Sequence, residues 1–274
     1  MNRLAQIKSC LLEGEEDLPD QTPLFKYLSI ESFLYLVEFK RINLSRITSW
    51  PDAYEGTRFE FFRKIKTQDE FSNNTKDDFY GSCWSLQTEE PCLYESQEIH
   101  KLAIKELYRN GSAAMWEAYC KNGGVRIKTT IKKLNALFLN VLASCSIYRG
   151  KVFYEPATSW NKTIRTSGLI SLLFMKRISF RHEAEYRYIL ISDEPRQKSI
   201  IDVSTGKLSD FLDEILVSPA VSSQKWLSRT LYHLGVDISL ENGTCINSKN
   251  AHQFCRISQL YGRVSEIVGH GHMS

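Results

Sequence analysis

The stretch that most constrains the fold of this chain is Glu183-Ala-Glu-Tyr-Arg-Tyr-Ile-Leu-Ile191, which alternates in polarity and then becomes continuously apolar. A period of two with β-branched and aromatic residues predicts a strand. In an extended chain Glu183, Glu185 and Arg187 share one face of that strand. Carboxylates next to an apolar run must be paired or hydrogen-bonded, because burying an isolated charge costs too much free energy. This strand is therefore the first candidate for a functional site.

Helical and extended patterns follow one another along the 274 residues without the strict strand–helix–strand rhythm of a parallel sheet. This order favours an α+β fold with a mostly antiparallel core. We expect an N-terminal helix over residues 2–13 and an acidic, proline-containing linker up to residue 23, followed by one α+β domain over residues 24–274. Further along, we expect a strand over residues 144–154, a helix around residues 164–175 and a last short element over residues 257–267.

Several functional classes lack support in the sequence. No apolar run approaches the roughly 18 residues that cross a bilayer, and the N-terminus lacks the apolar core of a signal peptide. The seven cysteines form no Cys-x-x-Cys pair and the six histidines supply no matching ligand pattern. The phosphate loop and the dinucleotide, hydrolase and metalloprotease motifs are also missing. We therefore expect a cytoplasmic protein with free thiols, no metal site and no membrane partner.

The charge is unevenly distributed along the chain. Residues 121–187 hold 13 Lys and Arg against 3 Asp and Glu, whereas the whole chain has a net charge of +3. A concentration of positive charge of this kind attracts polyanions and phosphate-bearing ligands. The alternative is an ordinary solvated basic surface.

Short motifs rich in aromatic residues and carboxylates remain as candidates. In chain order they are Lys26-Tyr27, the loop Pro51-Asp52-Ala-Tyr-Glu55-Gly56, Ser82-Cys-Trp84-Ser85, Trp116-x-x-Tyr119, and Glu183-x-Glu185-Tyr-Arg187. This order, over roughly residues 24–192, resembles a widespread bacterial domain family of unknown function, some of whose members occur in phage-defence operons. The loop departs from the Asn-Asp-Pro-Phe-Glu-Gly pattern associated with that family.

The same order is also similar to that of ADP-ribosyltransferases. Their split-sheet fold opens with a strand that bears Arg, His or Tyr, continues with a Ser-rich strand and ends with Glu-x-Glu at a strand start. Tyr27 or Lys26, then Ser82 and Ser85, and finally the two glutamates occupy those places, although the first strand has no Arg. The resemblance implies a compact α+β fold of split, mostly antiparallel sheets with flanking helices. It also implies NAD as the substrate and a mono-ADP-ribosyltransferase that acts as a toxin or defence effector.

The chemistry of that reaction gives the candidate residues roles. Cleavage of the nicotinamide–ribose bond passes through a positively charged, oxocarbenium-like state. Glu185 would stabilise this charge more in the transition state than in the ground state, and Glu183 would orient or deprotonate the acceptor. The remaining candidates are placed around the cofactor: Lys26, Tyr27, Ser82, Trp84, Ser85, Trp116 and Tyr119 in NAD binding, with Asp52, Glu55 and Arg187 as further site residues.

The acceptor and partners follow from the resemblance and from the charge. The basic segment favours a nucleic-acid acceptor. The chain would then be similar to the mRNA-modifying toxins of toxin–antitoxin–chaperone systems, which implies RNA as the acceptor and a cognate antitoxin with a chaperone as partners.

Two other functional classes stay open. One is a non-catalytic nucleic-acid-binding or interaction module in which the carboxylates are structural. The other is a hydrolase, either an NAD glycohydrolase or a metal-dependent nuclease built on Asp52, Glu55, Glu183 and Glu185. Each motif also has a structural interpretation, because aromatic side chains ordinarily fill cores and acidic loop residues ordinarily cap turns.

Overall fold

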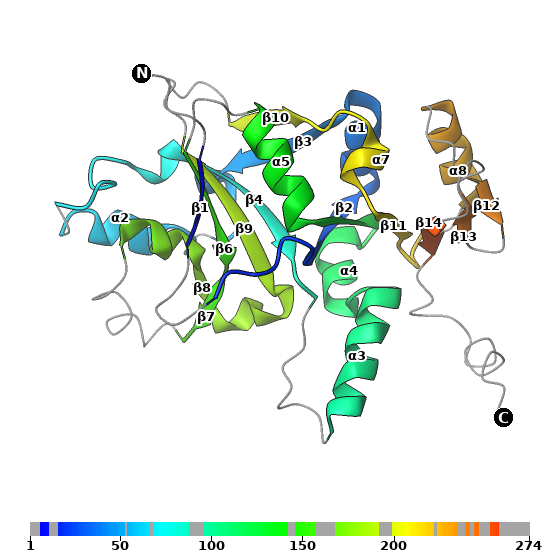
Figure 1. Cartoon of the computed structure of the whole chain (residues 1–274), viewed down its shortest axis with the longest axis horizontal. Coiled ribbons are helices and arrows are strands. Elements are labelled where there is room, and N and C mark those ends of the chain that lie inside the picture. The colour runs from blue at the N-terminus through cyan, green and yellow to red at the C-terminus, as the bar shows by residue number, and fades with distance from the viewer. Residues whose placement is uncertain are drawn as a thin grey trace. The chain divides into compact units, whose positions relative to one another are not determined.

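The computed structural model divides into two compact units, each assembled from three segments of the chain (Figure 1). The first unit contains residues 1–24, 40–86 and 129–211, and the second contains residues 25–39, 87–128 and 212–274. The structure describes residues 6–10, 16–52, 54–65, 68–87, 96–141, 146–156, 168–191, 199–221, 224–234, 239–241, 244–246 and 253–257.

The first unit is built on a sheet in the strand order β1-β6-β9-β4-β3-β10. Its strands are β1 (Gln6–Ser9), β3 (Arg41–Arg46), β4 (Phe79–Ser85), β6 (Ser146–Lys151), β9 (Glu185–Ile191) and β10 (Ile200–Ser204). Strands β1 and β6 pair in parallel, and the other four pairs are antiparallel. A separate pair, β7 (Phe153–Glu155) and β8 (Met175–Arg177), is parallel.

Strands β4 and β9 pair over their whole length, and this register assigns their side chains to two faces. Ser85 lies opposite Glu185 and Cys83 opposite Arg187, whereas Trp84 lies opposite Tyr186 and Ser82 opposite Tyr188. Directly opposed residues of an antiparallel pair share a face, and neighbours along a strand alternate. One face therefore carries the charged residues Glu185 and Arg187, and we call it the acidic face. The other carries Tyr186 and Tyr188, and we call it the tyrosine face.

Both faces of this sheet are covered by protein. The helices of the unit are α2 (Thr57–Phe62), α5 (Ile131–Val141) and α7 (Leu208–Phe211), and the 3₁₀ helices include η5 (Leu169–Phe174) and η6 (Ile178–Glu183). On the acidic face, Ile189 and Phe79 belong to a cluster that contains Phe59 of α2 and Phe174 of η5. On the tyrosine face, Phe138 of α5 packs against Tyr188 with ring centroids 4.9 Å apart. Strand β9 is accordingly buried throughout.

The second unit contains a sheet in the order β2-β5-β11-β14-β13-β12. Its strands are most of β2 (Pro23–Ser29) and β5 (Gly124–Thr130), with β11 (Glu214–Val217), β12 (Ser239–Glu241), β13 (Thr244–Ile246) and β14 (Gln253–Ile257). Its helices are α1 (Ile30–Phe39), α3 (Gln97–Asn110), α4 (Ala113–Cys120) and α8 (Gln224–His233). At its core the fully buried Arg126 guanidinium donates to Gln87, to the Leu107 and Tyr108 carbonyls, and to Glu214.

These elements confirm an α+β fold with a mostly antiparallel sheet and flanking helices, as the sequence predicted in coarse terms. Within the described residues no helix is long and apolar enough to cross a membrane. Cys10, Cys83 and Cys120 are free thiols. Each unit is assembled from non-contiguous segments, and two of the boundaries between the units fall inside strands β2 and β5.

Three local predictions need correction. The helix expected over residues 2–13 is wrong where the chain is described, since residues 6–9 form β1 and pair with β6. Pairing at the sheet edge gives these residues the backbone hydrogen bonds that a helix would otherwise provide, and this outweighs their local helix propensity. The helix expected around residues 164–175 is the 3₁₀ helix η5, followed at once by β8. The strand expected over residues 144–154 is two strands interrupted at Val152. The element expected over residues 257–267 lies, after Ile257, outside the described residues.

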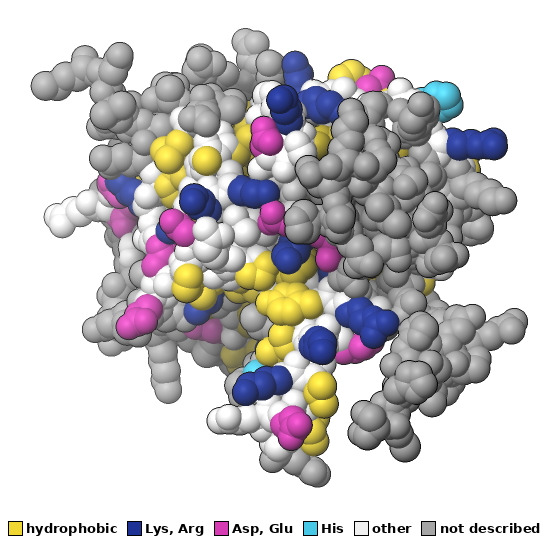
Figure 2. All heavy atoms as spheres, turned by 45° about the vertical axis from the view of Figure 1, so that its right-hand side comes forward, with side chains coloured by type: hydrophobic (Ala, Val, Ile, Leu, Met, Phe, Trp, Pro, Cys, Tyr) yellow, Lys and Arg dark blue, Asp and Glu magenta, His cyan; other side chains and the backbone are white. Residues whose placement is uncertain are grey.

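The basic segment predicted to attract polyanions is partly neutralised inside the fold. Arg126, Arg149, Lys176, Arg177 and Arg187 all form ion pairs, and most of their carboxylate partners lie far away in the sequence. On the face drawn in Figure 2, the Lys and Arg side chains of the described residues stand between acidic and hydrophobic ones. In the described part of the chain, ion pairs inside the fold therefore offset part of the local excess of positive charge.

Replacing Gly81 with alanine is expected to lower the free energy of unfolding by about 1–3 kcal/mol, since overpacking forces side chains and backbone to shift. A Cβ atom on Gly81 would lie 2.3 Å from the Trp50 ring and 3.3 Å from Ile189. Gly168 provides the matched control, because among the described residues its Cβ would meet only Asp69, at 3.6 Å. Urea denaturation measures both variants, and equal stabilities of G81A and G168A would contradict the close packing of Trp50 on β4.

Candidate functional site

Five charged side chains meet on the acidic face of the first unit, and we call them the glutamate cluster. Glu55 ends the loop before α2, Lys176 lies in β8, Glu183 ends η6, and Glu185 and Arg187 lie at the start of β9. All five side chains are at most 8% exposed. Charged groups are rarely buried to this degree unless they are paired.

The Lys176 ammonium is at the centre of the cluster. Its Nζ lies 2.5 Å from Glu183 Oε2, 2.6 Å from Glu185 Oε1 and 3.2 Å from Glu55 Oε1. Two of the three ammonium donors form hydrogen bonds with Glu183 and Glu185, and Glu55 is an ion-pair partner. Lys176 therefore brings together carboxylates from the loop before α2, from η6 and from β9.

Arg187 forms ion pairs with two of these carboxylates, those of Glu185 and Glu55. Its Nε donates to Glu185 Oε2 at 2.7 Å, and its Nη1 lies 2.9 Å from Glu55 Oε2. The same guanidinium donates to the Leu173 carbonyl at 2.7 Å, and the Trp50 ring covers it with a centroid 4.8 Å from Cζ. Glu185 is consequently held by two cations, and its backbone N–H donates to the Tyr154 hydroxyl at 2.8 Å.

A left-handed residue separates the two glutamates of the Glu-x-Glu motif. Ala184 has φ 43° and ψ 54°, so the chain turns between η6 and β9. The expectation that Glu183 and Glu185 share a face of one strand is therefore wrong, because β9 begins at Glu185. The turn nevertheless brings both carboxylates to Lys176. Non-glycine residues seldom adopt this conformation, and such strain is concentrated at functional sites.

The protonation behaviour of the two glutamates differs. Burial raises the pKa of Glu183, and the adjacent Glu185 raises it further, to about 7, although Lys176 acts in the opposite direction. Burial would also raise the pKa of Glu185, but Arg187 and Lys176 outweigh it and hold that pKa well below its usual value. The cluster has three carboxylates for two cations, and the raised pKa makes Glu183 more readily protonated than Glu185 as the pH falls.

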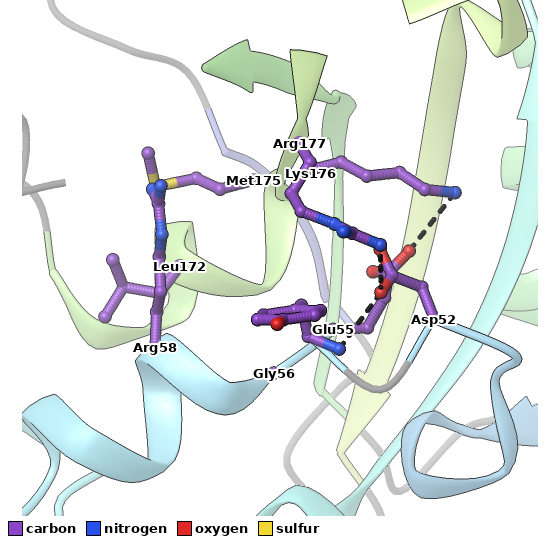
Figure 3. A pocket seen from close by; sticks show the side chains of 9 residues that line it. Asp52, Glu55, Gly56, Arg58, Leu172, Met175, Lys176 and Arg177 are labelled. Atoms are coloured by element: carbon purple, nitrogen blue, oxygen red, sulfur yellow. Dashed lines mark hydrogen bonds and ion pairs between the residues drawn. The ribbon is translucent and has the colours of Figure 1, made fainter. Parts of the chain in front are cut away.

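A pocket adjoins the cluster on the side of Lys176 and Glu55 (Figure 3). Its lining also includes the polar residues Asp52, Tyr54, Arg58 and Arg177 and the apolar residues Leu172 and Met175. Arg177 donates to Asp52 Oδ1 at 2.9 Å, and its guanidinium lies 4.4 Å from the Tyr54 ring centroid. The space left free holds about one water molecule. Tyr54 is 54% exposed, so it can move without disrupting the core.

The structure brings together four of the predicted site residues, namely Glu55, Glu183, Glu185 and Arg187. Asp52 is next to them in the pocket lining and pairs with Arg177. Ser85 is on the same face as Glu185 and directly opposite it. Ser82 and Trp84 are on the tyrosine face, where the Trp84 Nε1 donates to Ser82 Oγ at 3.1 Å. The sheet therefore separates these two residues from the carboxylates they were expected to join.

The predicted residues of the second unit are described within that unit. Tyr27 and Trp116 are 6% and 3% exposed and pack edge to face. The Tyr27 hydroxyl accepts from Gln87 at 2.6 Å and from the Ser112 N–H at 2.8 Å. Tyr119 is exposed, and Lys26 is half-buried in β2. The rings of Tyr27, Trp84 and Trp116 are thus covered by protein, and none presents a free face for stacking on a nicotinamide in this conformation.

Sequence reasoning missed the central position of Lys176 and the roles of Tyr54, Tyr154 and Arg177. Lys176 precedes Glu183 and Glu185 by seven and nine positions, and no strand or helix periodicity connects residues at these separations across η6 and Ala184. Tyr54 lies inside the acidic loop that was singled out. Nothing in the sequence marks Tyr154, because its contact with the Glu185 backbone depends on β7 lying beside the start of β9.

The arrangement of the carboxylates disfavours a metal centre. Lys176 occupies the position between Glu55, Glu183 and Glu185 where a cation would bind, and Asp52 is engaged by Arg177. Across the described part of the chain, no group of three His, Cys, Asp or Glu side chains is arranged to hold a metal ion.

Comparisons with protein-family models, with curated proteins and with solved structures give no match. The function of this site is therefore argued from its geometry.

Proposed function

We propose that the glutamate cluster is the catalytic site of an NAD-dependent mono-ADP-ribosyltransferase. The observation that carries this proposal is that two buried glutamates, Glu183 and Glu185, both accept from the Lys176 ammonium. Burial and the neighbouring charges displace their pKa values in opposite directions. Pairs of carboxyl groups with separated pKa values divide the acid–base and electrostatic roles in glycosyl chemistry. Buried titratable groups with displaced pKa values are also enriched at functional sites.

In this proposal Glu185 remains ionised and stabilises the positive charge that develops on the ribose as nicotinamide leaves. Its two cations hold the carboxylate in place, so little reorganisation is needed when the charge appears. Glu183 takes the proton from the acceptor hydroxyl or amino group as the new bond to the ribose forms. Because the two carboxylates meet at Lys176, both address the same small region.

The pocket supplies the groups that would bind the rest of NAD. Tyr54 offers an exposed ring at the pocket, and Arg177 and Arg58 offer cations for the pyrophosphate. We propose these residues in place of the buried rings of Tyr27, Trp84 and Trp116. Entry of a dinucleotide requires Tyr54 and the half-exposed Arg177 to move aside, as lids do in many enzymes. The proposed acceptor is RNA, and a cognate antitoxin with a chaperone is the proposed partner.

The direct test is incubation of the purified protein with labelled NAD and total RNA or a protein lysate. Label transferred to RNA supports both the proposed reaction and the proposed acceptor. Label transferred to protein supports the reaction but identifies protein as the acceptor. Release of free ADP-ribose alone indicates a glycohydrolase. Absence of NAD consumption both with RNA and with the lysate would refute the catalytic proposal.

The activity is expected to rise with pH through an apparent pKa near 7. Glu183 acts as a base only in its deprotonated form, and its pKa is about 7. Glu183→Gln is expected to lose this limb of the profile and to reduce kcat by about 10²–10⁴-fold. Steady-state rates between pH 5.5 and 8.5 measure both effects. If the activity of E183Q still rose with pH through the same apparent pKa, the titrating group would be a residue other than Glu183.

A second candidate function is a non-catalytic module in which the glutamate cluster is structural. It is favoured by the complete pairing of Lys176 and Arg187 and by a pocket that holds about one water molecule. This candidate predicts that substitutions in the cluster affect stability and leave RNA binding unchanged.

A further inference from the structure

The tyrosine face of the first unit carries a second polar cluster, on the opposite side of the sheet from Glu185. Arg149 of β6 lies opposite Tyr188 of β9, and Lys151 lies opposite Tyr186. The Arg149 side chain is 11% exposed, and Tyr186 is 1% exposed. This places a guanidinium next to two buried phenols, in a region to which the proposed reaction assigns no role.

Several donors of this cluster are unused. Within the described residues, the Tyr186 hydroxyl has no hydrogen-bond partner, and neither do Nε and Nη1 of Arg149. Burial raises the pKa of Tyr186, and Arg149 opposes the rise, so the two groups lie within electrostatic range of each other. Buried donors without partners are rare in folded proteins and call for an explanation, such as a ligand that is absent.

One donor of Arg149 is engaged by an acidic segment of the same chain, residues 16–20. Nη2 lies 2.6 Å from Asp17 Oδ2, and Nη1 lies 3.8 Å from Asp20 Oδ1, which is too far for a hydrogen bond. The Asp17 carboxylate also accepts from Ser9 Oγ at 2.5 Å and from the Leu18 N–H at 2.9 Å. The side chains of Asp17 and Asp20 are 35% and 62% exposed, so an ion from solution can reach Arg149 and compete with them.

We propose that Arg149 and Tyr186 form a binding site for a phosphate group. The Asp17 carboxylate, which pairs with Arg149, competes with the phosphate for this site. A phosphate carries more charge and more acceptor oxygens than one carboxylate, so it can engage Nε and Nη1 of Arg149 as well as the Tyr186 hydroxyl. Arginine binds phosphate in this two-pronged way. The site is independent of the glutamate cluster, since the sheet lies between them. Its phosphate comes either from a small phosphate compound or from the terminal phosphate of an RNA.

The test compares binding of inorganic phosphate, by titration calorimetry at low ionic strength, with binding of 5′-phosphorylated and 5′-hydroxyl ten-nucleotide RNA, by fluorescence anisotropy. Asp17→Asn is expected to tighten phosphate binding by about five-fold, because it removes a competing surface charge. Arg149→Lys is expected to weaken binding by about ten-fold, because lysine cannot offer the paired N–H groups. Tyr186→Phe is expected to weaken binding with a Tm at or above that of the wild type, since its hydroxyl has no partner to lose.

Asp210→Asn is the matched control, because Asp210 is an exposed aspartate on α7 whose removal changes the net charge equally. A preference for the 5′-phosphorylated RNA over inorganic phosphate identifies an RNA end as the source, and the reverse identifies a small compound. Equal phosphate affinity of D17N and D210N would overturn the proposal. Wild-type affinity of Y186F for phosphate would also overturn it, because this variant is expected to fold with a Tm at or above that of the wild type.

Discussion

Lys176→Met is expected to lower the free energy of unfolding by about 3–5 kcal/mol, the largest stability effect predicted for this chain. Removing one partner of a buried ion network leaves the other charges uncompensated. Here three carboxylates lose the ammonium that lies between 2.5 and 3.2 Å from each of them. Urea denaturation at pH 8, where Glu183 is largely ionised, measures the effect.

Lys121→Met is the matched control for this substitution. Lys121 pairs with Glu117 at 3.5 Å, but its side chain is 75% exposed, so its removal is expected to change stability by less than about 0.5 kcal/mol. Adding Glu183→Gln to the Lys176→Met variant is expected to recover part of the loss, since it removes one of the uncompensated charges. A loss below about 1 kcal/mol in K176M would show that the network contributes little to the fold.

Glu185→Gln is expected to reduce kcat/KM for NAD by about 10²–10³-fold, the loss typical when one fixed electrostatic group is removed from a transition state. Glutamine keeps the shape of the side chain but cannot stabilise the positive ribose. The readout is NAD consumption by the wild type and the variant, with circular dichroism at the assay temperature to show that E185Q is folded. KM is expected to change less than kcat, because the charge develops only in the transition state.

Glu60→Gln serves as the control for this experiment. Glu60 lies on α2 in the same unit and pairs with Arg63 at 2.7 Å, away from the pocket lining. It tests whether the loss of any paired carboxylate in this unit lowers activity. If E60Q and E185Q lost activity to the same degree, the effect would be one of stability, and Glu185 would have no catalytic role.

The sequence predicted a useful part of the candidate site. Glu183, Glu185 and Arg187 were singled out because charged residues immediately precede a buried strand. Glu55 was singled out because a loop carries acidic and aromatic side chains. These four residues meet in the structure. They lie together for one physical reason, which is that a carboxylate near a core requires a partner.

The sequence does not predict on which side of the sheet Ser82, Trp84 and Ser85 lie relative to Glu185. A period of two determines that Ser82 and Trp84 share one face of β4 and that Ser85 lies on the other. The sequence alone does not determine which of these faces carries Glu185, because a shift of one residue in the pairing with β9 would exchange them. The register places Ser85 opposite Glu185 and Trp84 opposite Tyr186, and this pairing exists only in the folded chain.

The sequence by itself therefore determined the α+β class, most strands and helices, and the carboxylates that need partners, since these depend on local periodicity and on the cost of burying charge. Only the tertiary structure placed Lys176 between three glutamates, left one carboxylate in excess and raised the pKa of Glu183 to about 7. It also paired much of the basic segment with acids from distant parts of the chain. Electrostatic interactions depend on distances of a few ångströms in space, and separations along the chain do not fix them.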